Sequence, residues 1–300
     1  MNWIILSLLA PAIYTVVNFI DKYVVEHKVK DSRGMPIYGT IVALLFGTAA
    51  WLIGGMPTLS LQNGLLVLFS GVISMWGFAL YFYALSKSQT SYIIALLQTT
   101  PIFTLVFAQL FLDEPLNMLQ LAGFVIVFAA ILGLSIDKVE RKIKLGSAFY
   151  AIIVANVLFA IASIAIKYTV DLDGFVPILA YESWGLVLGG IVLYLGFKNV
   201  RQAFWKSFRT VGNTTLAIMF LNESLFVVSK AITFLAISMG PVALVGVLGG
   251  TQVFYGFLYG IVLTLLFPTI FHEDIAKYDI IKKAVFSALL FLGVWFISQT

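Results

Sequence analysis

Long apolar runs separated by short polar connections make up almost the whole chain. A helix needs about 20 mostly apolar residues to cross a bilayer, and about ten runs reach that length. They are Trp3–Val24, Pro36–Gly54, Gly64–Leu85, Tyr92–Leu112, Leu116–Ile136, Gly146–Tyr168, Val176–Phe197, Gly212–Ser238, Val242–Phe267 and Ile281–Ser298. The first run continues to Val24 without a cleavage pattern, so we expect it to be a retained span. No connection is long enough for a soluble domain, so any functional site must lie among the helices.

The composition fits this pattern. The chain is 61% hydrophobic and 11% charged, with a mean hydropathy of +1.03, whereas a soluble domain has about 25% charged residues. We therefore predict an all-α integral membrane protein that crosses the membrane many times, in the plasma membrane of a bacterium or archaeon. Cysteine is absent, which excludes disulfides and thiol chemistry.

Few residues suit catalysis. His27 and His272 are the only histidines, which disfavours a zinc hydrolase. The close acidic pairs, Asp113-Glu114, Asp171 with Asp173, and Glu273-Asp274, lie in short connections rather than on one helix face that could hold a metal diphosphate. Neither a G-x-S-x-G motif nor a P-loop occurs. We expect a protein that is not an enzyme and has no metal or cofactor.

Basic residues gather in every second connection. The odd-numbered connections and their flanking helix ends hold Lys22, Lys28, Lys30, Arg33, Lys87, Lys138, Arg141, Lys142, Lys144, Lys198, Arg201, Lys206, Arg209, Lys277, Lys282 and Lys283. The even-numbered ones have only Lys167. Short basic loops stay in the cytoplasm, so this bias predicts cytoplasmic odd loops and outward termini. It also accounts for the net charge of +4 without a nucleic-acid partner.

Short motifs recur after about half the chain. Ala84-Leu85-Ser86 closes the third span as Ala236-Ile237-Ser238 closes the eighth, and Asp21-Lys22-Tyr23 ends the first as Ile166-Lys167-Tyr168 ends the sixth. This spacing indicates an internal duplication, with units at residues 1–143 and 144–300. Each unit has five spans, an odd number, so the second must cross the membrane upside down. Inverted repeats are typical of transporters, with the site at their interface near the midplane.

The first unit resembles the EamA family of the drug/metabolite transporter superfamily. The resemblance rests on Tyr81-Phe82-Tyr83-Ala84-Leu85-Ser86, Thr99-Thr100-Pro101, and Asp113-Glu114-Pro115 before Gly123 and Gly133. It covers the chain as two five-helix units, but the motifs match only in the first unit. It implies export or exchange of a small metabolite: an amino acid, a sugar, a nucleotide-linked compound or a drug-like molecule. The family also resembles proteins with cytoplasmic termini, opposite to the charge bias, so both orientations stay open.

Polar and aromatic residues near the middle of the spans are the candidate site. We expect the substrate-binding residues to be Tyr14, Asn18, Trp76, Tyr81, Gln98, Thr99, Asn156, Asn222, Glu223, Thr251, Gln252 and Tyr255. Interhelical hydrogen bonding is the alternative for each one, since such bonds are common in membranes and contribute about 0.6 kcal/mol on average. The spread of the set over both units favours a shared cavity.

Three charged residues lie well inside spans, since Lys22 and Lys167 sit at helix ends and can snorkel. Glu182 and Lys230 should reach matching depth on antiparallel helices, so we predict a structural ion pair, with substrate binding as the alternative. Glu223 has no obvious partner. A carboxyl group inside the membrane suits proton uptake and release, so Glu223 is the candidate coupling residue; the alternative is a protonated side chain hydrogen-bonded to Asn156 or Thr251.

These features predict a secondary active transporter, an exporter or exchanger that moves a small organic metabolite by alternating access. A proton gradient and solute exchange both remain as driving forces. The expected partners are a small organic substrate and membrane lipid. A flippase for a lipid-linked substrate is the alternative function, followed by an integral-membrane transferase.

Overall fold

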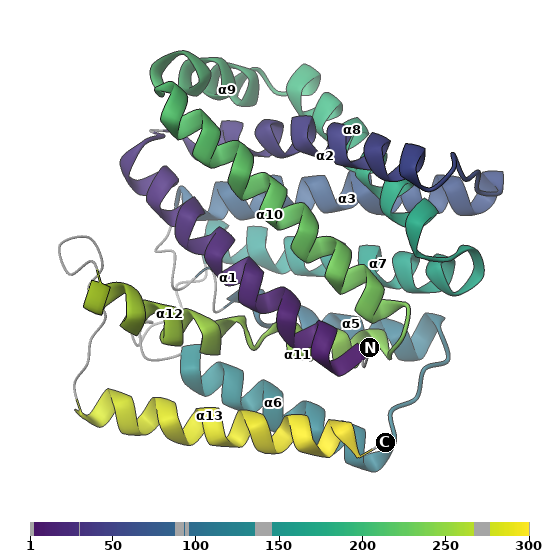
Figure 1. The fold of residues 1–300 in the computed structure, drawn as a ribbon, viewed down its shortest axis with the longest axis vertical. Coiled ribbons are helices and arrows are strands. Elements are labelled where there is room, and N and C mark those ends of the chain that lie inside the picture. The colour runs from purple at the N-terminus through teal and green to yellow at the C-terminus, as the bar shows by residue number, and fades with distance from the viewer. Residues whose placement is uncertain are drawn as a thin grey trace.

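The computed structural model describes residues 3–29, 31–87, 93, 96–135, 146–266 and 277–299. The regular secondary structure of this part of the chain is helical throughout. The helices are α1 (Trp3–His27), the 3-10 turn η1 (Ser32–Gly34), α2 (Met35–Ile53), α3 (Leu61–Leu85), α5 (Thr100–Phe111), α6 (Met118–Ser135), α7 (Ser147–Asp173), α8 (Phe175–Gly196), α9 (Lys198–Thr210), α10 (Asn213–Ile237), α11 (Val242–Gly249), α12 (Gln252–Leu266) and α13 (Lys277–Ser298). The long helices form a bundle with both termini at one end and α9 at the opposite end (Figure 1).

The ten predicted spans all contain an apolar helical segment. Among the described residues, seven segments are long and apolar enough to cross a membrane by length and composition, and three apolar helices are shorter, Thr100–Phe111, Met118–Leu134 and Ala284–Ser298. Large apolar side chains such as Ile53, Leu65 and Met118 point outward with 88%, 58% and 85% exposure. An apolar surface of this kind suits lipid rather than water. The predicted all-α, multi-pass membrane protein is thus confirmed.

Most of the main helix contacts are kept when the two halves are exchanged. In this exchange α1, α2, α3, α5 and α6 correspond to α7, α8, α10, α11 and α13. α1 packs along α10 as α3 packs along α7, and α5 contacts α7 as α11 contacts α1. Each of α2, α5 and α6 also packs against its own counterpart. This pattern agrees with two inverted five-helix repeats. The predicted boundary between residues 143 and 144 lies outside the described residues.

The fourth span is interrupted just before Pro101. The backbone amide of Thr99 donates to the carbonyl of Leu96, and Ile102 donates to Thr99, so the chain turns tightly before α5 begins at Thr100. Pro101 lies in the first turn of α5, where proline's missing amide leaves no hydrogen bond unmade.

The ninth span has a matching interruption that the sequence did not reveal. α11 ends at Gly249 and α12 starts at Gln252, with Gly250 and Thr251 between them. A Cβ atom on Gly250 would meet the end of the Ile131 side chain of α6, so the glycine leaves room for α6 to pack closely here. Both halves therefore carry a broken helix at the same place. Unwound backbone is tolerated inside a membrane only where it is buried in protein or lines a cavity.

Glycine also brings α3 and α8 into direct backbone contact. A Cβ atom on Gly71 would overlap the Cα atom of Gly185 and the carbonyl oxygen of Glu182. Small residues of this kind let membrane helices approach closely. The contact holds one helix of the first half tightly against one of the second.

The amphipathic helix α9 was not among the predicted elements. Its buried face carries Ala203, Phe204 and Ser207, and Ser207 lies 2.9 Å from the hydroxyl of Tyr38 on α2. Its other residues include four basic side chains, those of Lys198, Arg201, Lys206 and Arg209. We had read this segment as a basic connection, because thirteen half-polar residues are too short and too polar for a span.

Candidate functional site

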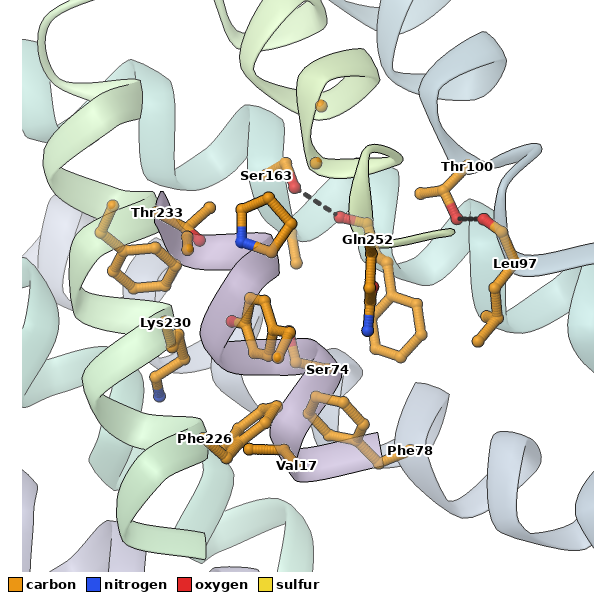
Figure 2. Close-up of a pocket in the computed structure, with 18 of the residues that line it drawn as sticks. Val17, Ser74, Phe78, Leu97, Thr100, Ser163, Phe226, Lys230, Thr233 and Gln252 are labelled. Atoms are coloured by element: carbon orange, nitrogen blue, oxygen red, sulfur yellow. Dashed lines mark hydrogen bonds between the residues drawn. The ribbon is translucent and has the colours of Figure 1, made fainter. Parts of the chain in front are cut away.

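A central cavity of about 400 Å³ lies between the two halves. Its walls come from α1, α2, α3 and α5 of the first half and from α7, α8, α10, α11 and α12 of the second. Figure 2 shows how side chains from these helices converge, among them Ser74 and Phe78 of α3, Phe226 and Lys230 of α10, and Gln252 of α12. The cavity therefore occupies the interface at which an inverted-repeat site is expected.

Two helices present one regular stripe of residues each to the cavity. The stripe of α1 is Ser7, Pro11, Tyr14, Asn18 and Asp21; the stripe of α10 is Glu223, Phe226, Lys230, Thr233 and Ile237. Steps of three and four residues keep these side chains on one helix face. Each stripe mixes polar, charged and aromatic groups, so the lining is amphipathic along its length.

One part of the cavity is acidic. The Nδ2 atom of Asn222 donates to Oδ1 of Asp21 at 2.8 Å, and the carboxyl group of Glu223 lies beside Gly39 of α2. Asp21 and Glu223 both line this part of the cavity, since Asn222, which bonds to Asp21, is the residue before Glu223. Among the described residues, no basic side chain forms an ion pair with either carboxyl group. This acidic pair is the least compensated charge in the cavity.

Lys230 follows Glu223 by two helical turns on the α10 stripe and meets Glu182 of α8. The Nζ atom of Lys230 lies 2.5 Å from Oε2 of Glu182, and the side chains are only 7% and 3% exposed. Nζ also lies 5.7 Å from the ring centre of Phe234. Since the ion pair is buried, each charge is neutralised by its partner. Lys230 therefore leaves no net positive charge in the cavity.

Four aromatic rings form a chain across the cavity. Ring centres are 5.6 Å apart for Tyr14 and Phe226, 5.2 Å for Phe226 and Phe78, and 5.0 Å for Phe78 and Phe159. The rings come from α1, α10, α3 and α7, so each half contributes two. Their faces and edges offer an organic solute apolar and stacking contacts.

The two broken helices supply polar groups to the wall. Gln98 and Thr100 line the cavity from the first break, and Gly250 and Gln252 from the second. Thr100 donates to the carbonyl of Leu97 at 2.7 Å (Figure 2). The carbonyl of Gln252 accepts a bond from Thr15 of α1 at 3.2 Å.

Lys167 joins several polar groups at the end of the bundle at which the termini lie. Its Nζ atom is 3.1 Å from Asp171, 3.4 Å from Glu114, and 3.2 Å from the carbonyl of Ile237. Glu114 also accepts a bond from the amide of Val242 at 3.1 Å. We expected Lys167 to snorkel outward; it is instead 8% exposed, because these acceptors compensate its charge.

The structure brings together most of the predicted site residues, but not all. Those that line the cavity are Tyr14, Asn18, Tyr81, Gln98, Asn222, Glu223 and Gln252, with Glu182 and Lys230. Those outside the lining are Trp76, Thr99, Asn156, Thr251 and Tyr255.

Asn156 and Thr99 form hydrogen bonds at the first helix break and do not line the cavity. Nδ2 of Asn156 donates to the carbonyl of Leu96 and to Oγ1 of Thr99, both at 2.9 Å. The break frees backbone carbonyls, and the amide satisfies one of them. Asn156 is therefore not a hydrogen-bond partner of Glu223.

Three further residues point elsewhere. Trp76 lies two positions after Ser74, about 200° around the helix, and packs against Phe197 with ring centres 6.0 Å apart. Tyr255 packs against Tyr259 with ring centres 6.1 Å apart. Thr251 is 1% exposed at the second break, and its hydroxyl has no hydrogen-bond partner among the described residues. Thr251 does not bond to Glu223 either.

Asp21 is the charged cavity residue that was absent from the predicted site. Its place beside Lys22 at a helix end suggested only a repeat marker. The available signal was its spacing, since Asp21 follows Tyr14 and Asn18 at seven and three residues and so shares their face. Within the described residues, no group of three or more His, Cys, Asp or Glu side chains could hold a metal ion.

Comparisons with known proteins agree with this architecture. Residues 1–136 match the model of the EamA-like transporter family. An uncharacterized protein from Methanocaldococcus jannaschii is 30% identical over 142 residues, which cover 45% of this chain and 96% of that protein. One chain in a solved crystal structure superposes with a TM-score of 0.70 over 98% of this chain and 94% of its own, at 16% identity, a likeness of fold alone. With this fold, the chain belongs to the EamA-like transporter family of the drug/metabolite transporter superfamily and is a membrane transporter.

Proposed function

We propose that the protein is a secondary active transporter that moves a small organic solute by alternating access, with the central cavity as the solute site. The observation that carries the proposal is that both halves line one cavity of about 400 Å³. Cavities of about 300–1,000 Å³ lined by apolar groups and a few polar ones suit small molecules. Placement between inverted repeats lets the same cavity face either side of the membrane in turn.

An asymmetry between two matching helix contacts supports alternating access. α3 packs on α8 through Gly71 and Gly185, backbone against backbone. In the matching contact of α10 with α2, the carboxyl group of Glu223 stands beside Gly39. Both halves share one fold. A second state is therefore available to the chain, in which α10 packs closely on α2 and α3 is less close to α8.

Glu223 is the proposed coupling residue. It lines the cavity, and no described basic residue pairs with it. An ionised carboxylate inside a membrane is costly, so Glu223 favours a state with a bound proton or a bound cationic solute. Other titratable groups that line the same cavity include Asp21 of α1 and Tyr81 of α3.

The proposal is tested in two steps with purified protein. A thermal-shift screen against amino acids, sugars, amines, nucleotides and drug-like compounds finds ligands, because a ligand that binds only the folded state stabilises it. Compounds that raise the melting temperature are then tested for uptake into proteoliposomes, with and without an imposed pH gradient. Saturable uptake of a stabilising compound is the expected result. Lipid scrambling without uptake of any soluble compound would instead support a flippase and contradict the proposal.

A further inference from the structure

The described residues that line the cavity include more acidic than basic side chains. Four of them have ionisable acidic or basic side chains: Asp21, Glu182, Glu223 and Lys230. Lys230 forms an ion pair with Glu182 at 2.5 Å. The carboxyl groups of Asp21 and Glu223 have no ion-pair partner among the described residues. An anionic solute would meet no uncompensated cation there.

Asn222 adds an unfilled acceptor to the same place. Its side chain is 3% exposed and lines the cavity, and its Nδ2 atom is bound to Asp21. Its Oδ1 atom is buried without any hydrogen-bond partner among the described residues. A buried acceptor without a donor is costly. A ligand that brings N–H donors and no acceptor, as an ammonium group does, would complement Asp21, Asn222 and Glu223 together.

Aromatic rings stand next to these acceptors. Phe226 follows Glu223 by three residues on the same face of α10, and its ring packs against Tyr14 and Phe78. Rings beside a cation attract it electrostatically and bind the apolar part of an organic molecule. The acceptors and the rings therefore form one continuous surface with a charged end and an apolar body.

We propose that the cavity selects organic cations, namely amines with an aromatic or branched apolar body, whose ammonium group binds between Asp21 and Glu223 while the body lies against Phe226, Phe78 and Tyr14. This inference rests on the proposed transport function and narrows its substrate class. It excludes phosphorylated, nucleotide-linked and carboxylate solutes. One ammonium group and one proton together balance the two carboxylates.

Three probes of equal shape and different charge test the selection. They are 3-phenylpropylamine, 3-phenylpropionamide and 3-phenylpropionate, which are cationic, neutral and anionic at pH 7. Binding is measured by titration calorimetry on the purified full chain, and uptake by competition in proteoliposomes. The amine should bind at least about tenfold more tightly than the anion, a difference of about 1.4 kcal/mol, with the amide between them.

Variants connect the selection to the proposed residues. Asp21→Asn and Glu223→Gln should each reduce the ratio of amine to anion affinity by about tenfold or more, while Phe226→Leu should weaken the amine and the amide alike. The ratio compares two ligands on one variant, so a general loss of stability does not change it. Asp31→Asn is the matched control. Its carboxyl group lies outside the cavity, and a hydrogen bond from Arg33 holds the pKa of Asp31 below its usual range, so this variant also removes a negative charge at pH 7.

The outcomes separate this inference from the proposed function. Equal or tighter binding of the anion, or an unchanged affinity ratio in both acidic variants, would overturn the choice of cations. Saturable uptake of neutral or anionic solutes would then support the proposed transport function with another substrate class. If no compound of any charge binds or crosses the membrane, both the inference and the proposed function fail.

Discussion

Gly71 and Glu223 occupy matching positions in α3 and α10. The same shift in residue number carries Leu61 to Asn213 and Leu85 to Ile237, the ends of the two helices, and it carries Gly71 to Glu223. Gly71 lets α3 touch the backbone of α8, whereas Glu223 places a carboxyl group between α10 and α2. The same position of the duplicated helix is therefore a glycine that permits close helix packing in the first half and an ionisable carboxyl group in the second half.

Alanine substitution of two glycines tests this difference. A Cβ atom on Gly71 would overlap backbone atoms of α8, which cannot move aside, whereas a Cβ atom on Gly39 would meet only the carboxyl end of Glu223, with Oε2 at 2.9 Å. Gly71→Ala should therefore lower stability by about 1–3 kcal/mol. Gly39→Ala should be tolerated in folding and slow transport. Thermal denaturation and proteoliposome uptake of both variants provide the measurements. A stable Gly71→Ala protein would show that the α3–α8 contact is looser than described.

Glu223→Gln should keep the fold and lose coupling. The amide is nearly isosteric and removes a charge that is costly inside the membrane, so the melting temperature should stay equal or rise. Uptake driven by a pH gradient should vanish, because the amide cannot carry the proton. Asp173→Asn serves as the control: this carboxyl group lies at the end of α7, bonded to Asn63, and its loss should leave uptake unchanged. Full pH-driven uptake by Glu223→Gln would reduce Glu223 to a structural residue.

The buried pair predicts a rescue. Glu182→Gln leaves the ammonium group of Lys230 without its partner at 2.5 Å, a loss of about 3–5 kcal/mol for a buried pair. Adding Lys230→Met removes the orphaned charge and should restore much of the stability. Melting temperatures of the wild type, both single variants and the double variant complete the cycle. A double variant as unstable as Glu182→Gln alone would argue against a structural role for the pair.

Cysteine labelling can settle the orientation. The basic side of α9 and the neighbouring connections predict that Lys142 and Arg201 face the cytoplasm and that both termini face outward. Since the chain has no cysteine, single cysteines at these two positions and at the termini report on one site each. An impermeant thiol reagent on intact cells should label the termini alone. Labelling at positions 142 and 201 instead would support cytoplasmic termini, as the family resemblance implies.

The sequence by itself determined the class, the number of spans and the duplication. Each of these can be recognised locally. A run of about 20 apolar residues is long enough to cross the bilayer, and a duplication is visible as motifs repeated along the chain. The charges inside spans could also be identified, because an ionisable group is conspicuous in an apolar run. Glu182 and Lys230 were placed at matching depth by helix geometry alone.

Only the tertiary structure decided which polar residues share the cavity. Gln98 faces it while the adjacent Thr99 bonds to Asn156, because a helix break within the fourth span redirects side chains in a way that a continuous helix would not. Asp21 joined the site because α1 packs along α10 and brings it to Asn222, a contact between residues about two hundred positions apart in the sequence. Span composition is a local property, whereas the direction of a side chain depends on where two distant helices cross and where each one unwinds.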